Sequence, residues 1–376
     1  MKLTEEQEAL RATVREFARE VVAPVIPDHY EKHSFPYEIV RQMAAMGLFG
    51  LPFPEEYGGM GGDYVALCVA LEELARVDSS VAITLEAAIS LGAMPIYRYG
   101  TEEQKRRWLP LLTSGEALAA FGLTEPGFGS DAGGTQTRAV LDGDHWVING
   151  SKAFITNSGT DITALVTVTA LTGPDEISAI IVPSHTPGFT VGPAYSKVGW
   201  CASDTHPLHF DDVRVPAGNL LGQRGRGFAQ FLRTLDEGRV AIAALATGLA
   251  QGCVDESVAY AKQRYAFGRP IGGHQAIAFK LADLEMRAHT ARLAWYDAAT
   301  RLDDGRDFKR AAAIAKLYAS EVAVTNAREA TQIHGGYGFM NEYPVARFWR
   351  DAKILEIGEG TSEIQRMVIA RSMGVG

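Results

Sequence analysis

A carboxylate between two glycines is the first candidate for chemistry in this sequence. Glu359 stands between Gly358 and Gly360, shortly before Ser362 and Gln365. Such a residue can act as a general base, because its glycine neighbours let a substrate approach closely. The same stretch also reads as a loop that enters the last helix, with Ser362 and Gln365 as a capping box. Taken alone, these residues favour the simple helix start.

A second glycine-rich stretch, residues 127–132, has the G-x-G-x-x-A spacing of dinucleotide-binding loops. That function needs a helix directly after the glycines, because the pyrophosphate binds at the helix N-terminus. Gly133, Gly134 and the strand-like segment 137–141 follow instead, so we reject the dinucleotide fold. The stretch remains either a connection between domains or a loop that approaches a flat polar ring, since Thr124 and Ser130 add hydroxyls to its small residues.

Two helix ends carry further candidates. Arg264 ends one expected helix, either as a solvated cap or as a partner for a diphosphate, which suits a planar guanidinium. Gln332 and His334 precede glycines that are most simply C-cap residues. Metalloprotease, esterase and P-loop motifs do not occur in the sequence, so hydrolysis and phosphoryl transfer have no support.

Apolar residues recur at helical spacing in the first and last thirds of the chain, whereas the middle reads as short strands. Capping boxes at Thr4 and Thr101 predict two helix starts, and Asn149-Gly150 predicts a hairpin between strands at 146–148 and 154–156. Further helices are expected at 37–46, 64–77, 79–99, 240–264, 275–302, 309–335 and 361–373.

These elements predict a mainly α fold with a central β domain. We expect an N-terminal α-helical domain over residues 1–118, a small middle β-barrel or sandwich over 119–228, and a C-terminal four-helix bundle over 229–376. The bundle is expected to hold the four long helical stretches that follow residue 239.

Composition excludes several classes of protein. The 376 residues carry a net charge of −9, so no basic face is expected for nucleic acid. The cysteines, Cys68, Cys201 and Cys253, are far apart and fit neither a disulfide framework nor a zinc site. No signal peptide and no run of about 18 apolar residues occurs. We therefore expect a cytoplasmic protein with no metal site and no membrane span.

Five stretches, taken together, resemble the acyl-CoA dehydrogenase family. They stand in the family's order and the similarity covers nearly the whole chain: Leu-Thr-Glu-Pro-Gly-Phe-Gly-Ser-Asp (123–131), Phe-Ile-Thr-Asn (154–157), Arg-x-x-Phe-Gly-x-Pro (264–270), Gln-Ile-His-Gly-Gly-Tyr-Gly (332–338) and Glu-Gly-Thr-Ser-Glu-Ile-Gln-Arg (359–366). One such motif is weak, but five in register outweigh the simple structural explanations above.

The resemblance implies an FAD-dependent enzyme that converts a fatty acyl-CoA to the trans-2-enoyl-CoA. In this reaction Glu359 would remove the α-proton and flavin N5 would take the β-hydride. The implied isoalloxazine contacts are Phe121, Leu123, Thr124, Gly129, Ser130, Phe154 and Thr156. The rest of FAD would be held by Arg264, Phe267, Gln275, Thr361 and Glu363, with Gln332 and Gly336 from the adjacent subunit, and the CoA substrate by Ser130, Asp236, Arg239 and Gly360.

The position of the base separates branches of this family. Some members carry it directly before the arginine that matches Arg239, where this chain has Gly238. Glu237 lies one residue earlier and would point roughly 100° away around a helix. Glu359 is therefore the better candidate, and the pattern resembles the short-chain branch.

Two departures from the family leave properties open. Phe154 stands where Trp is usual, which leaves the electron acceptor open, and Gly358 stands where many members have Tyr, which leaves the acyl chain length open. We expect an electron-transfer flavoprotein as acceptor, a homotetramer built as a dimer of dimers, and a short or branched substrate of fatty acid β-oxidation. The alternatives are an acyl-CoA oxidase, a non-catalytic flavin- or CoA-binding scaffold, and a hetero-oligomer with shared sites.

Overall fold

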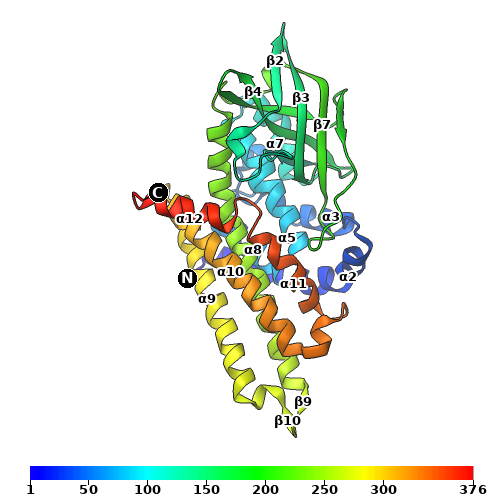
Figure 1. Ribbon diagram of the computed structural model, residues 1–376, viewed down its shortest axis with the longest axis vertical. Helices are drawn as coiled ribbons and strands as arrows, with labels where there is room; N and C mark the ends of the chain where they lie inside the picture. Colours follow the sequence, from blue (N-terminus) through cyan, green and yellow to red (C-terminus); the bar gives the residue numbers. More distant parts are fainter. Residues whose placement is uncertain (376) are drawn as a thin grey trace.

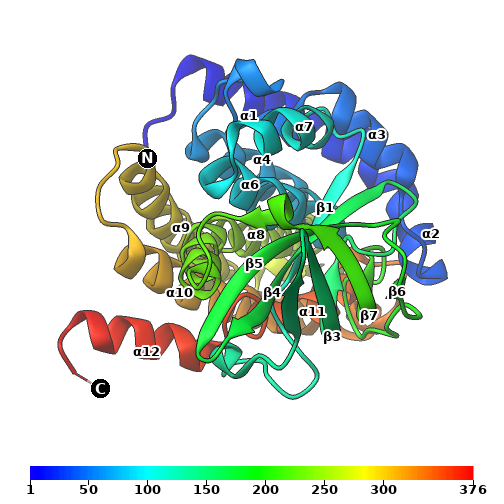
Figure 2. The same ribbon diagram turned by 90° about the horizontal axis from the view of Figure 1, so that it is seen from above.

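The computed structural model describes residues 1–375 and confirms the predicted order of helices, strands and helices. The chain is 58% helical and 17% strand, which makes it a mainly α protein. The molecule is elongated, with the β domain at one end and the C-terminal helices extending away from it to the small β9–β10 ribbon (Figure 1). Seen from above, α8 runs between the N-terminal helices and strands β4 and β5 (Figure 2).

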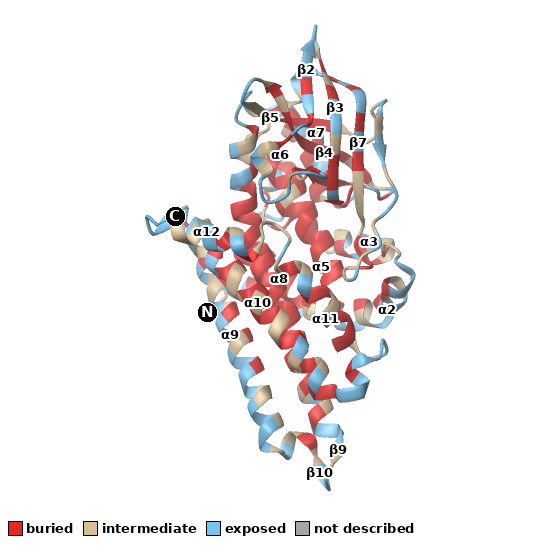
Figure 3. Ribbon diagram, viewed as in Figure 1, coloured by how far each residue is buried: buried red, intermediate tan, exposed pale blue. Residues whose placement is uncertain are grey.

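The N-terminal part is helical throughout, and both predicted capping boxes are present, with Thr4 and Thr101 as the N-caps. A π-helical segment, Ala87–Ala93, joins α5 to α6 without a break. Figure 3 shows that α5 and the part of α8 beside it are almost wholly buried. The helices are α1 Glu5–Phe17, α2 Ala23–Lys32, α3 Tyr37–Ala45, α4 Tyr64–Ala75, α5 Ser79–Glu86, α6 Met94–Tyr99 and α7 Glu102–Thr113.

One helical stretch of the described chain, Ser79–Tyr99, is long and apolar enough to cross a membrane by length and composition alone. In the folded protein, however, 94% of that apolar window is buried against other elements. Its apolar character is therefore accounted for by packing in the core.

The middle region is one twisted sheet with its own small core, which includes Trp146, Val168 and Phe210. The strand order is β6-β7-β3-β2-β4-β5-β8, with β1 pairing in parallel with β4. Over residues 1–375 this path stays open, so the β domain is not a closed barrel. The strands are β1 Leu118–Gly122, β2 Arg138–Asp142, β3 His145–Thr156, β4 Thr163–Gly173, β5 Glu176–Pro183, β6 Phe189–Val191, β7 Thr205–Pro216 and β8 Leu220–Leu221.

The predicted hairpin at Asn149-Gly150 is wrong. Strand β3 runs straight through both residues, and its register against β7 shifts between Ile148 and Gly150. A Cβ at position 150 would lie 2.5 Å from Thr137 Oγ1. Glycine is therefore required at this bulge because Thr137 packs closely against its backbone. The actual turn lies between β2 and β3, at Gly143, whose φ is +62°.

The C-terminal part is helical as predicted, with two differences. Helix α8 begins at Gly227, well before the expected Val240, and an additional helix, α11, begins at Pro344. Helix α11 packs on α8 and α10, whereas α12 contacts α10 and then projects outward (Figure 2). The elements are α8 Gly227–Gln263, β9 Tyr265–Ala266, β10 Arg269–Pro270, α9 Gln275–Asp303, α10 Lys309–His334, α11 Pro344–Leu355 and α12 Ser362–Ser372.

Candidate active site

Glu359 lies in the short loop between α11 and α12 with an unusual backbone. Its φ is +52° and that of Gly360 is +96°. The left-handed region costs a non-glycine residue roughly 1 kcal/mol, and such residues gather at functional sites. The loop therefore holds Glu359 in a left-handed backbone conformation that residues with a Cβ atom disfavour.

The carbonyl oxygen of Gly360 is the anchor of this loop. It accepts hydrogen bonds from Lys316 Nζ at 2.8 Å and from Gln365 Nε2 at 2.9 Å. Lys316 comes from the middle of α10 and is fully buried, and burial lowers the pKa of its ammonium to about 8. If the loop moved, the buried Lys316 ammonium would lose the Gly360 carbonyl oxygen as its acceptor. Because an uncompensated buried charge is costly, this contact fixes the position of the loop.

The Glu359 residue is partly exposed as a whole, but both of its carboxylate oxygens are buried. Neither oxygen has a hydrogen-bond donor anywhere in residues 1–375. Burial raises the pKa of this carboxyl to about 7, against the lowering effects of Glu86, Lys316 and Arg239. A base with a pKa near neutrality suits proton removal from a weak carbon acid.

The glycine at position 238 leaves room for this carboxylate. A Cβ at Gly238 would lie 2.3 Å from Glu359 Oε2, closer than real side chains come. Positions 238 and 359, the two places where members of the family carry the base, therefore face the same space. A side chain at position 238 would displace the carboxylate of Glu359.

Glu237, the other carboxylate in this region, is occupied elsewhere. It is buried and pairs with Arg98 at 3.2 Å and with Arg233 at 3.9 Å. Its neighbours Asp236 and Arg239 form a buried ion pair with each other, one turn along α8. Arg239 also lies near the glycine loop, since its Nη2 is 3.6 Å from the position of a Cβ at Gly360.

The residues expected at the isoalloxazine come together at the edge of the β domain. The Ala153 N–H donates to Thr124 O at 2.9 Å, which joins the 123–130 loop to the end of β3. Phe154 has a φ of +61° and is 65% exposed, and Thr156 ends the strand beside it. Phe121 and Leu123 are buried at the start of the loop, whereas Gly129 and Ser130 are exposed at its tip.

A buried ion pair holds that loop in shape. Lys152 Nζ donates to Leu123 O at 3.2 Å and to Glu125 Oε1 at 2.8 Å. The ammonium holds the pKa of Glu125 at about 2, although burial opposes it. Beyond this pair, a Cβ at Gly127 or Gly129 would meet no atom within 4 Å. An exposed aromatic ring beside open backbone fits a planar polar group such as the flavin ring.

The residues expected at the FAD diphosphate lie far from this place. Arg264 and Gly336 line a hollow of about 480 Å³ at the end of the helical bundle. Phe267 is 97% exposed on the adjoining ribbon, Gln275 opens α9, and Gln332 is in the last turn of α10. Figure 1 shows this ribbon at the opposite end of the molecule from the β domain. At roughly 1.5 Å per residue, α8 separates Arg264 from Gly238 by about 39 Å.

The resemblance assigns Arg264 to the FAD diphosphate, with Gln332 and Gly336 contributing from the adjacent subunit. Within one chain of the structure, Arg264 and Gly336 line the same hollow. These two residues of one chain are therefore placed to contact the same ligand.

The start of α12 differs from the predicted capping box by one residue. Thr361 is the N-cap, and its hydroxyl accepts from the Ile364 N–H at 3.3 Å. Ser362 is buried inside the helix, and Gln365 donates to the glycine loop instead of capping. Glu363 is exposed in the first turn, where hydrogen bonds lower its carboxyl pKa.

Two residues near Glu359 were not predicted from the sequence. Glu86 is fully buried at the end of α5, and both of its carboxylate oxygens lack a donor among the described residues. Lys316 is the loop anchor described above. Each is a single charged residue inside a long apolar or alanine-rich helical segment. Such an isolated charge is the sequence signal that could have identified Glu86 and Lys316 as buried polar residues.

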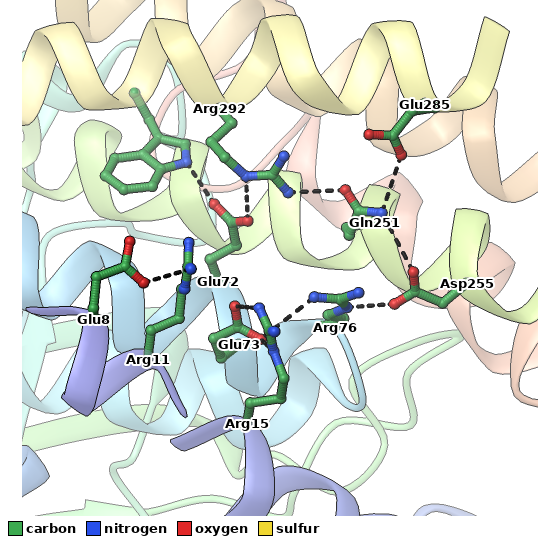
Figure 4. Close-up of polar contacts among 11 residues, drawn as sticks. Glu8, Arg11, Arg15, Glu72, Glu73, Arg76, Gln251, Asp255, Glu285 and Arg292 are labelled. Carbon is green, nitrogen blue, oxygen red and sulfur yellow. Dashed lines mark hydrogen bonds and ion pairs between the residues drawn. The ribbon is translucent and has the colours of Figure 1, made fainter. Parts of the chain in front are cut away.

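Another hollow, of about 240 Å³, lies between α1, α4, α8 and α9 and has a different character. It is lined by arginines and carboxylates that pair with one another (Figure 4). Glu72 accepts from Arg292 Nε at 2.7 Å and from Trp295 Nε1 at 2.9 Å, and Arg15 donates to Glu73. Because its charges are already paired, this hollow is a structural junction.

Comparison with known proteins agrees with this geometry. Three family models match the chain: the N-terminal domain of acyl-CoA dehydrogenase over residues 4–116, its middle domain over 120–213 and its C-terminal domain over 225–374. A short-chain specific acyl-CoA dehydrogenase of Clostridium acetobutylicum is 45% identical over 98% of each chain.

Solved structures give the same result. Butyryl-CoA dehydrogenase of Megasphaera elsdenii is 44% identical, with a TM-score of 0.97 over 99% of each chain. A chain solved in work on the electron transferring flavoprotein of Acidaminococcus fermentans is 42% identical, also with a TM-score of 0.97 over 99% of each chain. This chain therefore belongs to the acyl-CoA dehydrogenase family, closest to its short-chain branch, and is an FAD-dependent oxidoreductase.

Proposed function

We propose that this enzyme dehydrogenates the Cα–Cβ bond of a short acyl-CoA thioester, with Glu359 as the base that takes the α-proton. The observation that supports this most strongly is the buried carboxylate of Glu359, which accepts no hydrogen bond from an N–H or a hydroxyl within residues 1–375 and has a pKa raised to about 7. The strained backbone of this residue, between two glycines, also supports an active-site role.

The base meets a specific chemical demand. The α-C–H of a thioester is a very weak acid, so the base must be ionised near working pH and the thioester oxygen must be polarised as charge develops on it. We assign the polarising contact on the protein side to the Glu359 backbone N–H. FAD, when bound, supplies the acceptor for the β-hydride.

The binding residues divide into three groups under this proposal. Phe154 and Thr156, with the 121–130 loop, hold the isoalloxazine, and Thr361 with Glu363 contact the adenosine side. Asp236, Arg239, Ser130 and Gly360 serve the CoA substrate. Arg264, Phe267, Gln275, Gln332 and Gly336 hold the diphosphate of a second FAD. The division of the chain into three domains, 1–118, 119–228 and 229–376, belongs to the same proposal.

We propose a homotetramer built as a dimer of dimers. The separation of about 39 Å along α8 exceeds an extended FAD molecule, so one FAD can meet the Phe154 set and the Arg264 set only if they come from two chains. This length supports a pair of chains, and the family resemblance supports the pairing of two such dimers. Mass photometry of the flavin-loaded protein tests both steps: a monomer with tightly bound FAD would contradict the pair, and a dimer would contradict the tetramer.

The substrate and the electron acceptor rest on similarity. A relative named butyryl-CoA dehydrogenase supports a short acyl chain, and the structure from work on an electron transferring flavoprotein supports that acceptor. An acyl-CoA oxidase is the alternative, and H₂O₂ release measured against dye reduction separates the two. The three buried free cysteines support a reducing, cytoplasmic location.

The decisive experiment is anaerobic bleaching of the bound flavin with a panel of acyl-CoA substrates, using the wild type and Glu359→Gln. We expect the wild type to bleach with short chains. The variant should keep its flavin spectrum and lose roughly 10³-fold in rate, as expected for removal of a general base. Near-normal bleaching by the variant would show that another group is the base.

A further inference from the structure

We propose that Glu86 is a positioning residue for the base: a neutral carboxyl that donates a hydrogen bond to the Glu359 carboxylate in the resting enzyme. This inference rests on the proposed function, in which Glu359 acts as the base. It assigns a role to a buried acidic side chain that lies outside the family's five sequence motifs described above.

The Glu359 carboxylate lies over Gly238, close to the π-helical segment that begins directly after Glu86. Glu86 ends α5 at the point where the helix changes to the π-helical segment Ala87–Ala93. Leu91 of this segment lies 3.5 Å from the position of a Cβ at Gly238, and the same position is 2.3 Å from Glu359 Oε2. The widened π-helical turn and the glycine loop therefore face each other across α8, and π-bulges of this kind are frequent at functional sites.

The four carboxylate oxygens of this pair are buried, and none is hydrogen-bonded to an N–H of residues 1–375. The Ser90 hydroxyl, one turn after Glu86, lowers the pKa of Glu86, but less than burial and Glu359 raise it. Two negative charges so placed would repel each other and lack solvation. One proton on the pair removes the repulsion and turns the contact into a hydrogen bond.

The environment decides which carboxyl holds that proton. Burial and the neighbouring Glu359 raise the pKa of Glu86 well above its usual range. The hydrogen bond from Glu86 instead lowers the pKa of Glu359, which remains at about 7 because burial opposes it. Above about pH 7 the single proton therefore lies on Glu86, and the ionised Glu359 accepts.

The surrounding polar groups are directed elsewhere. Lys316 from α10 and Arg239 from α8 both lower the pKa of Glu359, but Lys316 donates to Gly360 O and Arg239 to Asp236. Tyr64 from α4 donates to the Glu237 carbonyl and lies 3.1 Å from Ser90 Oγ, one turn after Glu86. The other groups around Tyr64 are the Glu237 carboxyl, which is paired with Arg98, and the Cys68 thiol, whose pKa burial raises.

This pair can take up the substrate proton without a further partner. At rest it holds one proton and one negative charge. When Glu359 removes the α-proton, the pair holds two protons and becomes neutral. Glu86 thus keeps Glu359 ionised and oriented before the reaction without itself contacting the reacting carbons.

The test compares Glu86→Leu, which removes the donor, with Glu86→Gln, which keeps an N–H donor of the same length. In the wild type, kcat/KM should rise with pH through about 7, because the base acts only when ionised. In Glu86→Leu this rise should move about one pH unit higher, which is about a tenfold loss on its acid side. Glu86→Gln should stay within about twofold of the wild type.

Infrared spectroscopy gives a readout independent of turnover and of the leucine variant. At about pH 9, where Glu359 with its pKa of about 7 is ionised, the wild type should show the carbonyl band of a buried protonated carboxyl, and Glu86→Gln should lack it. Glu72→Gln is the matched control, since it removes a buried carboxyl that is already paired with Arg292 and should keep the band. A band that survives in Glu86→Gln would overturn the proposal.

The kinetic outcomes are equally distinct. An unshifted pH profile in Glu86→Leu, or an equal shift in both Glu86 variants, would overturn hydrogen-bond donation by Glu86. If Glu359→Gln loses turnover while both Glu86 variants match the wild type, only this inference fails. If Glu359→Gln keeps turnover, the proposed base itself is wrong.

Discussion

The Glu72–Glu73 pair on α4 and the Glu86–Glu359 pair beside α8 bury the same chemical group in different ways. Glu72 is held by Arg292 and Trp295, and Glu73 by Arg15 and Arg76 (Figure 4). Every charge there has a partner. The oxygens of Glu86 and Glu359 are hydrogen-bonded to no N–H within the described chain and have no counter-charge of their own, but the two carboxyls can share a proton.

The difference separates stability from reactivity. Burial raises the pKa of Glu72 above its ordinary value, and its partner Arg292 limits that rise. At Glu359 burial is opposed less effectively, and the pKa stays at about 7. A satisfied carboxylate ties α4 to α9 and has no spare affinity for a proton, whereas an unsatisfied one can accept a proton from a substrate.

The largest effect is expected at Gly238, because the absence of a side chain there leaves room for the Glu359 carboxylate. Gly238→Ala places a methyl group 2.3 Å from Glu359 Oε2, so the carboxylate must move. We expect kcat/KM to fall by roughly 10²-fold, since displacements of about 1 Å cost that much. The control is Gly358→Ala, whose Cβ would have only Ile354 O at 3.5 Å. Equal losses in both variants would contradict the steric argument.

Breaking the satisfied pair should affect stability and not catalysis. Arg292→Leu leaves Glu72 buried beside Trp295 without its main counter-charge. We expect the free energy of unfolding to fall by about 2 kcal/mol, measured by urea denaturation. Per-site kcat of the flavin-loaded enzyme should be unchanged, and a fall in kcat without loss of stability would show that this hollow serves the active site.

The loop anchor should give a smaller effect on rate. Lys316→Met removes the donor to Gly360 O and a positive charge that lowers the pKa of Glu359. We expect kcat/KM near pH 7 to fall about tenfold, and its rise with pH to move upward. Lys316→Arg, which keeps the charge, is the matched variant. An upward shift of equal size in Lys316→Arg would show that the charge is not the cause.

The smallest effect is expected at the rim of the hollow between α1, α4, α8 and α9. Arg11 and Glu8 form an ion pair one turn apart on α1, with both side chains about one-third exposed or more. Arg11→Ala should change the free energy of unfolding by less than about 0.5 kcal/mol, because exposed pairs contribute little. A loss as large as that of Arg292→Leu would mean that burial does not distinguish the two pairs.

Local patterns in the sequence were enough for much of the fold. The capping residues Thr4 and Thr101, the long apolar periods and the β-branched middle depend on neighbours a few residues apart. The errors arose where a distant neighbour overruled a local signal. Asn149-Gly150 is a bulge because β7 pairs along it. Helix α11 is a different case, because Val345, Phe348, Ala352 and Leu355 recur at helical spacing and the local signal was overlooked.

The sequence by itself determined the family, the FAD motifs and the choice of Glu359 over position 238, since each depends on residue identity at fixed spacing. Only the tertiary structure decided that Gly238 and Glu359 compete for one place and that Glu86 meets the base. It also decided that Arg264 and Phe154 lie at opposite ends of one chain. A pKa and a shared proton depend on burial and on nearby charges, and packing brings those together from parts of the chain whose spacing carries no such information.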